Sequence, residues 1–278
     1  MRKLLAVLLL MAASAAWAAP MLNLITLTGP GSLTDTALRK VAPAIERETG
    51  MAVVIQNLPG AGGILGARAA LEAPADGATV LMGNSSLVHM ALTQPAMGFD
   101  PVAAFAPLQG LVRGEFGVFV PAASAVRAPA DLRAGGQTFV GVASPMGSMS
   151  AILLDRTLGL QSVEVGYKQF GQAVADLAGG RLSHMTGPVD ASALRAMLDA
   201  GRIRQVGTLA ELGVADFSWS GFFVRADTPT QTQRSLAEAL RRAVSTTPLD
   251  GRLDVSGQEL RRIQLGEAPT MRAALKLQ

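Results

Sequence analysis

The stretch NLPGAGGILG, residues 57–66, lies between a short β-branched run at 52–56 and a helical pattern at 63–72. Glycine allows the tight turns and close backbone approaches that a strand-to-helix junction requires. The glycine spacing is one residue too long for the dinucleotide-binding fingerprint, and Pro59 stands where the strand ends. The stretch therefore predicts a strand-to-helix unit and gives only a weak signal for a nucleotide.

The same alternation of short strand-like runs and amphipathic helical patterns continues along the whole chain. Such alternation is typical of helix-covered parallel sheets, so we expect the α/β class. The length of 278 residues fits one large or two medium domains. The predicted strands are 22–27, 52–56, 79–82, 117–120, 138–142, 162–165, 204–208 and 221–224, and the predicted helices include 36–49, 63–72, 150–158, 172–177 and 191–199.

A second junction, TGPGSLTD at residues 28–35, also follows a strand and opens a helix. Ser32 and Thr34 are candidate N-caps, and the free N–H groups of a helix start favour an anion such as a carboxylate. An ordinary strand-to-helix turn explains the segment equally well. Asp35 has two interpretations, because it either accepts a ligand ammonium group or stabilises the positive end of the helix.

The first residues have the three parts of a secretory signal. Arg2 and Lys3 are basic, Leu4 to Ala13 is an apolar run too short to span a bilayer, and Ala16-Trp17-Ala18 is a small-x-small cleavage site. We therefore expect cleavage near Ala18, a mature chain that starts at Ala19, and a location in the periplasm. The chain has no cysteine, so a lipid anchor is excluded.

Composition excludes several classes of function. The formal net charge of +3 falls to +1 once Arg2 and Lys3 are removed, and the arginines are scattered, so no nucleic-acid partner is expected. Without cysteine, and with His89 and His184 far apart, we expect no metal site and no cofactor. An exported α/β hydrolase stays an alternative that needs one of these histidines beside a serine and a carboxylate.

The junction at 57–66 is one of a series of motifs that resembles a known family over nearly the whole chain after the signal. Together they resemble the substrate-binding proteins of tripartite tricarboxylate transporters, the Bug or TctC-like family. The order and spacing of the motifs carry the resemblance, since no single one is decisive. The others are PG (30–31) with Asp35, ADG (75–77), GNSS (83–86), FDP (99–101), FAP (105–107), Ser144 with GS (147–148), YK (167–168), DLAGG (176–180), AG (200–201) and WSGF (219–222).

The resemblance implies a two-lobed type II periplasmic binding protein fold, with mixed sheets flanked by helices and the ligand in the cleft between the lobes. The implied lobes are residues 19–118 with 223–278, and residues 119–222, joined by two hinge strands. The implied function is a monomeric receptor, not an enzyme, that captures a small carboxylate-bearing solute. Its implied partner is an inner-membrane tripartite transporter or, as an alternative, a membrane sensor protein.

The resemblance also implies which residues bind the ligand, through backbone amides, hydroxyls and bridging waters. Few cations are assigned to the cleft, so a monocarboxylate or dicarboxylate is expected. The chain departs from the family where Gln169-Phe170 replaces a glycine pair, which adds bulk near the cleft mouth and leaves the ligand's identity open. The implied ligand-binding residues are Gly31, Ser32, Leu33, Thr34, Asp35, Asn84, Ser85, Ser86, Ser144, Met146, Gly147, Ser148, Ser150 and Tyr167, with Pro145 in the same loop.

Overall fold

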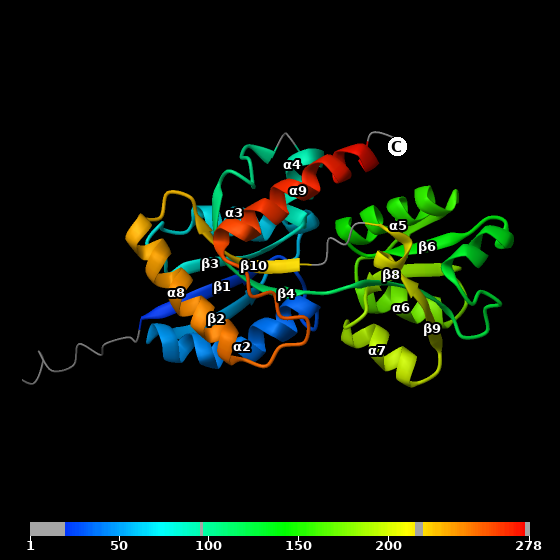
Figure 1. Ribbon diagram of the computed structural model, residues 1–278, viewed down its shortest axis with the longest axis horizontal. Coiled ribbons are helices and arrows are strands. Elements are labelled where there is room, and N and C mark those ends of the chain that lie inside the picture. Colours follow the sequence, from blue (N-terminus) through cyan, green and yellow to red (C-terminus); the bar gives the residue numbers. More distant parts are fainter. Residues whose placement is uncertain (1–19, 95–96, 215–218, 276–278) are drawn as a thin grey trace, which may run out of the picture.

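The structure, a computed structural model, describes residues 20–94, 97–214 and 219–275. The export signal expected at residues 1–18 and the expected start at Ala19 lie outside the described residues. Two five-stranded sheets, each with helices on both faces, form two lobes that lie side by side (Figure 1). We name the lobe around the amino-terminal strand the first lobe and the other the second lobe.

The sheet of the first lobe has the strand order β2-β1-β3-β10-β4, in which β1, β2 and β3 are parallel and β10 is antiparallel to both neighbours. Helices α2 and α8 cover one face, and α3, α4 and α9 cover the other. The elements are β1 Met21–Thr26, α2 Leu33–Thr49, β2 Ala52–Asn57, η1 Ala61–Gly63, α3 Ile64–Glu72, β3 Thr79–Asn84, α4 Ser86–Thr93, β4 Phe105–Arg113, β10 Trp219–Arg225, α8 Thr230–Thr246 and α9 Gly257–Leu275.

The sheet of the second lobe has the equivalent order, β7-β6-β8-β5-β9, with β6, β7 and β8 parallel and β5 antiparallel to β8 and β9. Helix α5 packs on one face, and α6 and α7 pack on the other. The elements are β5 Phe116–Pro121, η3 Pro129–Gly135, β6 Phe139–Val142, α5 Pro145–Leu158, β7 Val163–Gly166, α6 Phe170–Ala178, β8 His184–Pro188, α7 Ser192–Asp199, β9 Ile203–Thr208 and η4 Ala210–Leu212.

Each sheet contains a strand that enters from the other lobe. The chain leaves the first sheet after Arg113 and enters the second at Phe116, where β5 inserts between β8 and β9. It leaves the second sheet after Thr208 and returns at Trp219, where β10 inserts between β3 and β4. The predicted α/β class with two mixed sheets is confirmed. The division predicted at 118/119 and 222/223 stays a prediction.

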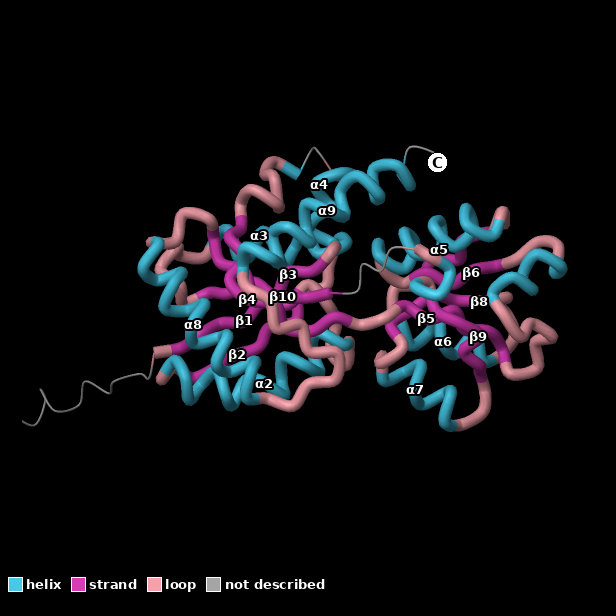
Figure 2. The backbone as a smooth tube through the Cα atoms, viewed as in Figure 1, coloured by secondary structure: helices cyan, strands magenta, loops and turns pink. Residues whose placement is uncertain are grey.

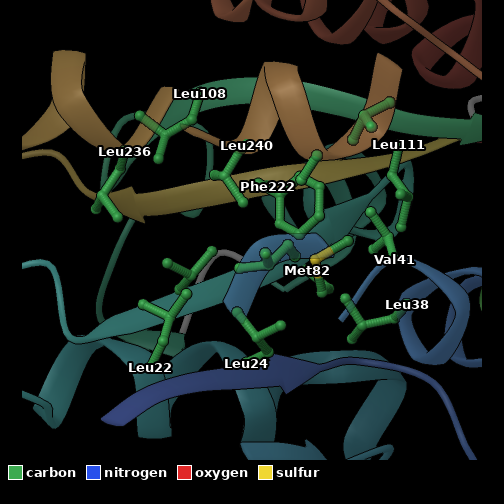
Figure 3. Packing of buried hydrophobic residues seen from close by; sticks show 14 of the residues in the cluster. Leu22, Leu24, Leu38, Val41, Met82, Leu108, Leu111, Phe222, Leu236 and Leu240 are labelled. Atoms are coloured by element: carbon green, nitrogen blue, oxygen red, sulfur yellow. The ribbon is translucent and has the colours of Figure 1, made fainter. Parts of the chain in front are cut away.

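The first-lobe core lies between the sheet and helices α2 and α8 (Figure 3). In β1, Leu22 and Leu24 are fully buried, as the two-residue period of a strand requires. Leu38, Val41 and Ile45 of α2 share one helix face and are also fully buried. This packing holds α2 on the face of the sheet, and the loop that precedes α2 follows β1 directly.

Helix α9 packs against both lobes. It begins on the first sheet, and its carboxyl end extends toward the second lobe (Figure 2). Met271 and Ala274 belong to one buried apolar cluster together with Phe116, Val118 and Met149 of the second lobe. Among the described residues, no helix has the length and apolar character that crossing a membrane requires.

Candidate functional site

A cavity of about 990 Å³ lies between the two lobes. Its walls are the segments that follow the carboxyl ends of the parallel strands: β1, β2 and β3 in the first lobe, and β6, β7 and β8 in the second. In open α/β sheets, ligands bind outside the carboxyl ends of the strands. The position of the cavity is therefore that of a ligand site.

Five described helices begin at the wall of this cavity. The first residues of α2, α4, α5, α6 and α7 all line it. The N-terminus of a helix has unpaired N–H groups and carries about half a positive charge. Helix starts gathered around one cavity make it favourable for an anion, because each start offers hydrogen-bond donors and positive potential.

The loop that precedes α2 is held rigid by Asp35. Its carboxylate accepts hydrogen bonds from Gly31 N (2.9 Å), Asn57 Nδ2 (2.9 Å) and the Arg39 guanidinium. Burial by itself raises the pKa of Asp35, but these hydrogen bonds outweigh burial and hold the pKa below its ordinary value. Ser32 is the N-cap of α2, as the sequence predicts. Asp35 is 3% exposed and is absent from the cavity wall, so its contacts favour the helix-start interpretation.

The hydroxyl groups of Thr34 and Ser86 remain available at the cavity wall of the first lobe. Thr34 is 7% exposed and Ser86 is 8% exposed, and neither side-chain hydroxyl has a hydrogen-bond partner among the described residues. Asn84 accepts a bond from Ser86 N (2.9 Å) through Oδ1, which leaves its amide N–H groups as donors. Hydroxyls, amides and the first N–H groups of α2 therefore form a donor-rich side of the cavity.

Glu267 of α9 bonds to two residues of the cavity wall. Its Oε1 accepts hydrogen bonds from Trp219 Nε1 (2.5 Å) and Ser85 Oγ (3.3 Å), and both donor residues line the cavity. Ser85 is fully buried and Glu267 is 8% exposed. Ser85 lines the cavity as the sequence predicts, but its hydroxyl is engaged by Glu267 of α9.

The second-lobe loop residues Ser144, Pro145, Met146 and Gly147 line the opposite wall. Ser144 is the N-cap of α5 and accepts a hydrogen bond from Gly147 N (3.0 Å). Pro145 at the first helical position has no N–H group, which suits a helix start. The loop thus presents the hydroxyl of Ser144 and the N–H group of Met146 from a capped, rigid turn.

Three predicted site residues lie away from the cavity wall. Ser148 Oγ donates to Glu164 (2.8 Å), Ser150 Oγ donates to the carbonyl of Met146 (2.8 Å), and Tyr167 OH donates to Asp176 (2.9 Å). Asp35 is a fourth, as described above. The other predicted residues, Gly31, Ser32, Leu33, Thr34, Asn84, Ser85, Ser86, Ser144, Met146 and Gly147, all line the cavity.

The start of α7 also lines the cavity, although it was not among the residues predicted from the sequence. Ser192 and Ala193 line the cavity, and so do Thr186 and Gly187 of the preceding strand β8. The N-cap of α7 is Ala191, whose side chain makes no capping bond, so the usual sequence signature of a helix start is missing. The start of α7 could have been placed at the cavity only from its position after β8, because the carboxyl end of that strand faces the cleft.

Formal charge is sparse around the cavity. Lys168 is the one charged side chain among the described residues that line it, and it is exposed. The described lining includes no acidic side chain, and in the described part of the chain no group of three or more His, Cys, Asp or Glu could hold a metal ion. The electrostatics therefore favour an anion without a metal bridge.

The two histidines do not form a catalytic group with a serine. His89 Nδ1 lies 3.3 Å from Thr93 Oγ1 on the same helix. His184 is fully buried in β8, and within the described ranges neither ring nitrogen has a hydrogen-bond partner. A serine hydrolase needs a histidine bonded to both the serine and a carboxylate. The described residues therefore lack the arrangement that the hydrolase alternative requires.

Comparisons with known proteins agree on one family. The sequence profile described as "Tripartite tricarboxylate transporter family receptor" matches residues 37–260. Protein BugT of Bordetella pertussis is 29% identical over 260 residues, which covers 80% of this chain and 78% of BugT. The profile match therefore includes the second sheet, strands β2, β3, β4 and β10 of the first sheet and most of the segments that line the cavity, but it begins after β1 and the loop that precedes α2.

Two solved structures have the same fold. Rpa4515 of R. palustris, determined with adipate, superposes with a TM-score of 0.78 and 25% identity, covering 94% of this chain and 97% of that one. MatC of Rhodopseudomonas palustris, determined with bound malate, gives a TM-score of 0.77 and 21% identity, covering 91% and 98%. Adipate and malate are both small carboxylates.

Proposed function

Because this chain belongs to the tripartite tricarboxylate transporter receptor family, whose members are solute receptors and not enzymes, we propose that it captures a small carboxylate in the interlobe cleft and delivers it to a tripartite transporter. The observation that carries the proposal is the donor-rich wall of the first lobe. There, two nearly buried hydroxyls, those of Thr34 and Ser86, have no partner in the described chain. In this proposal the signal at residues 1–18 is removed near Ala18, and the receptor works in the periplasm.

The polar groups at this wall match the needs of a carboxylate. A carboxylate accepts several hydrogen bonds and gives none, so it suits the N–H groups of Leu33 and Thr34 at the start of α2 and the amide of Asn84. Hydrogen bonds to a charged group are each worth about 1.5–3 kcal/mol, more than bonds between neutral groups. A few such donors in a sheltered cavity therefore hold an anion without an arginine.

The same wall disfavours an amino acid as the solute. Binding an ammonium group in a sheltered cavity is costly unless an acidic partner is present. Asp35 is nearly buried behind the loop, and the described lining offers no carboxylate. We therefore expect a carboxylic acid without an amino group, with Lys168 adding one positive charge at the exposed side.

Isothermal titration calorimetry with succinate and aspartate tests the function, because the two acids share the same carbon chain and differ in one ammonium group. We expect succinate to bind and aspartate to bind at least about tenfold more weakly, the equivalent of about 1.4 kcal/mol. Malate and adipate extend the test to the acids found in the relatives. If none of these carboxylates gives a heat of binding, the proposed function is rejected. If aspartate binds as tightly as succinate, the expectation that the site disfavours an ammonium group is rejected.

Replacing Thr34 with valine is expected to weaken succinate binding by about tenfold or more, because a hydrogen bond to a charged group is lost while the side-chain shape is kept. The control is Thr36→Val, two residues further along the same helix, where the threonine is exposed to solvent and absent from the cavity wall. Calorimetry gives both affinities. Equal losses in the two variants would show that the effect comes from the helix and not from the site.

A further inference from the structure

The two lobes touch directly at residues that line the cavity. Ser192 Oγ, at the start of α7 in the second lobe, donates a hydrogen bond to the carbonyl of Gly31 in the first lobe, at 3.2 Å. Nearby, a β-carbon placed on Gly62 of the first lobe would lie 3.1 Å from Pro145 Cγ of the second. The lobes therefore meet at two points that border the cavity, and one of these points is a specific hydrogen bond.

Gly31 is fixed from both sides. Its N–H group donates to Asp35 Oδ2 at 2.9 Å within the first lobe, while its carbonyl accepts from Ser192 in the second. Its φ of +76° lies in the left-handed region that glycine adopts at little cost, which permits this peptide orientation. A carbonyl that is held rigidly in one lobe is a good docking point for a hydroxyl from the other, because little entropy is lost when the bond forms.

The same loop also faces the solute. Gly31 precedes Leu33 and Thr34, the residues whose donors line the cavity, by two and three positions. A solute that binds these donors therefore binds the same rigid loop whose carbonyl accepts the hydrogen bond from Ser192. Closure of a cleft adds to affinity in proportion to how strongly the closed state is favoured over the open one.

We propose that Ser192 is a positioning residue. Its hydrogen bond to the carbonyl of Gly31, which we name the interlobe latch, holds the second lobe against the loop before α2 and thereby stabilises the closed, solute-binding conformation. The part of this inference that concerns affinity rests on the proposed function. The part that concerns closure does not, because the hydrogen bond joins two segments of the chain itself. A neutral hydrogen bond stabilises by about 0.5–1.5 kcal/mol, which is about a two- to tenfold change in the ratio of closed to open molecules.

Small-angle X-ray scattering of the ligand-free protein tests closure, and calorimetry with succinate tests affinity. We expect Ser192→Ala to increase the radius of gyration and to weaken succinate binding by about two- to tenfold. Ser192→Thr keeps the hydroxyl at an exposed position and is expected to match the wild type. The control is Ser245→Ala on α8, which removes an exposed hydroxyl bonded to the carbonyl of Arg242 but leaves the interlobe contact intact.

The outcomes separate the inference from the proposed function. An alanine variant with unchanged scattering and unchanged affinity overturns the latch. A loss of thermal stability that is absent from the Ser245 control, with unchanged affinity and scattering, assigns Ser192 a merely structural role and also overturns it. If no carboxylate binds to any variant but Ser192→Ala alone expands the molecule, the latch stands and the proposed function fails.

Discussion

Replacing Gly221 with alanine is expected to lower the free energy of unfolding by about 3 kcal/mol, at the upper end of what overpacking a core costs. Gly221 lies in β10, the strand that enters the first sheet from the second lobe. A β-carbon there would lie 2.7 Å from the carbonyl oxygen of Gln109 and would collide with a methyl group of Leu260 on α9. To relieve these two close contacts, β10 must move away from β4 or α9 must move off the sheet, and either movement opens the core.

The matched control is Gly166→Ala, which changes the same residue type in strand β7 of the second lobe. A β-carbon on Gly166 would meet no described atom within 4 Å, so alanine fits without a collision. Alanine also restricts the unfolded chain more than glycine does, so this variant is expected to be neutral or more stable by up to about 1 kcal/mol. Urea unfolding of both variants measures the difference. Equal stability of the two would mean that the first sheet relaxes freely around Gly221.

The second large effect concerns pH and the buried histidine of β8. Burial lowers the pKa of His184 to about 4 and the charge of Asp155 opposes this, while an unfolded chain gives histidine a pKa near 6.5. Between these values the unfolded chain binds a proton that the folded protein does not. The contribution of His184 to the free energy of unfolding is therefore complete above pH 6.5. It decreases by about 3 kcal/mol in total as the pH falls toward 4.

His184→Met tests this effect, because methionine is uncharged at every pH and fills a similar volume. The two ring nitrogens of His184 have no partner in the described chain, so methionine is expected to leave stability at pH 7.5 unchanged or higher. Urea unfolding at pH 7.5 and pH 4.5 should then show a smaller drop for the variant than for the wild type. Asp35, Asp131 and Asp176 have pKa values lowered from 3.8, so they contribute mainly below this range. A variant that loses as much stability as the wild type would contradict the assignment.

The parallel part of each sheet could be predicted from local patterns, because a βα unit contains its own signals. Residues 28–35 and 57–66 mark strand ends and helix starts within a few positions. Strand β4 gave no such signal, since Pro107 and Gly110 interrupt its pattern. Proline is tolerated there because β4 is the last strand of the sheet order, and Gly110 makes room for the carbonyl of Leu253. These reasons depend on neighbours that are distant in the sequence.

The candidate site could be predicted at the level of loops but not of individual side chains. The loop at Ser144 lines the cavity as expected, because its position after a strand is a local property. Which hydroxyls remain available depends on partners that a sequence pattern does not specify. Tyr167 is engaged by Asp176, and Ser85 is engaged by Glu267, which lies 182 positions away.

The exchange of strands between the lobes also determines when the chain can fold. Strand β3 ends at Asn84, but its neighbour β10 begins only at Trp219, after the whole second lobe. A polypeptide that emerges from the ribosome amino end first thus lacks a central strand of its first sheet until late in synthesis. Pairing between such distant segments is slow, because the chain loses the entropy of closing a long loop before any stabilising contact forms.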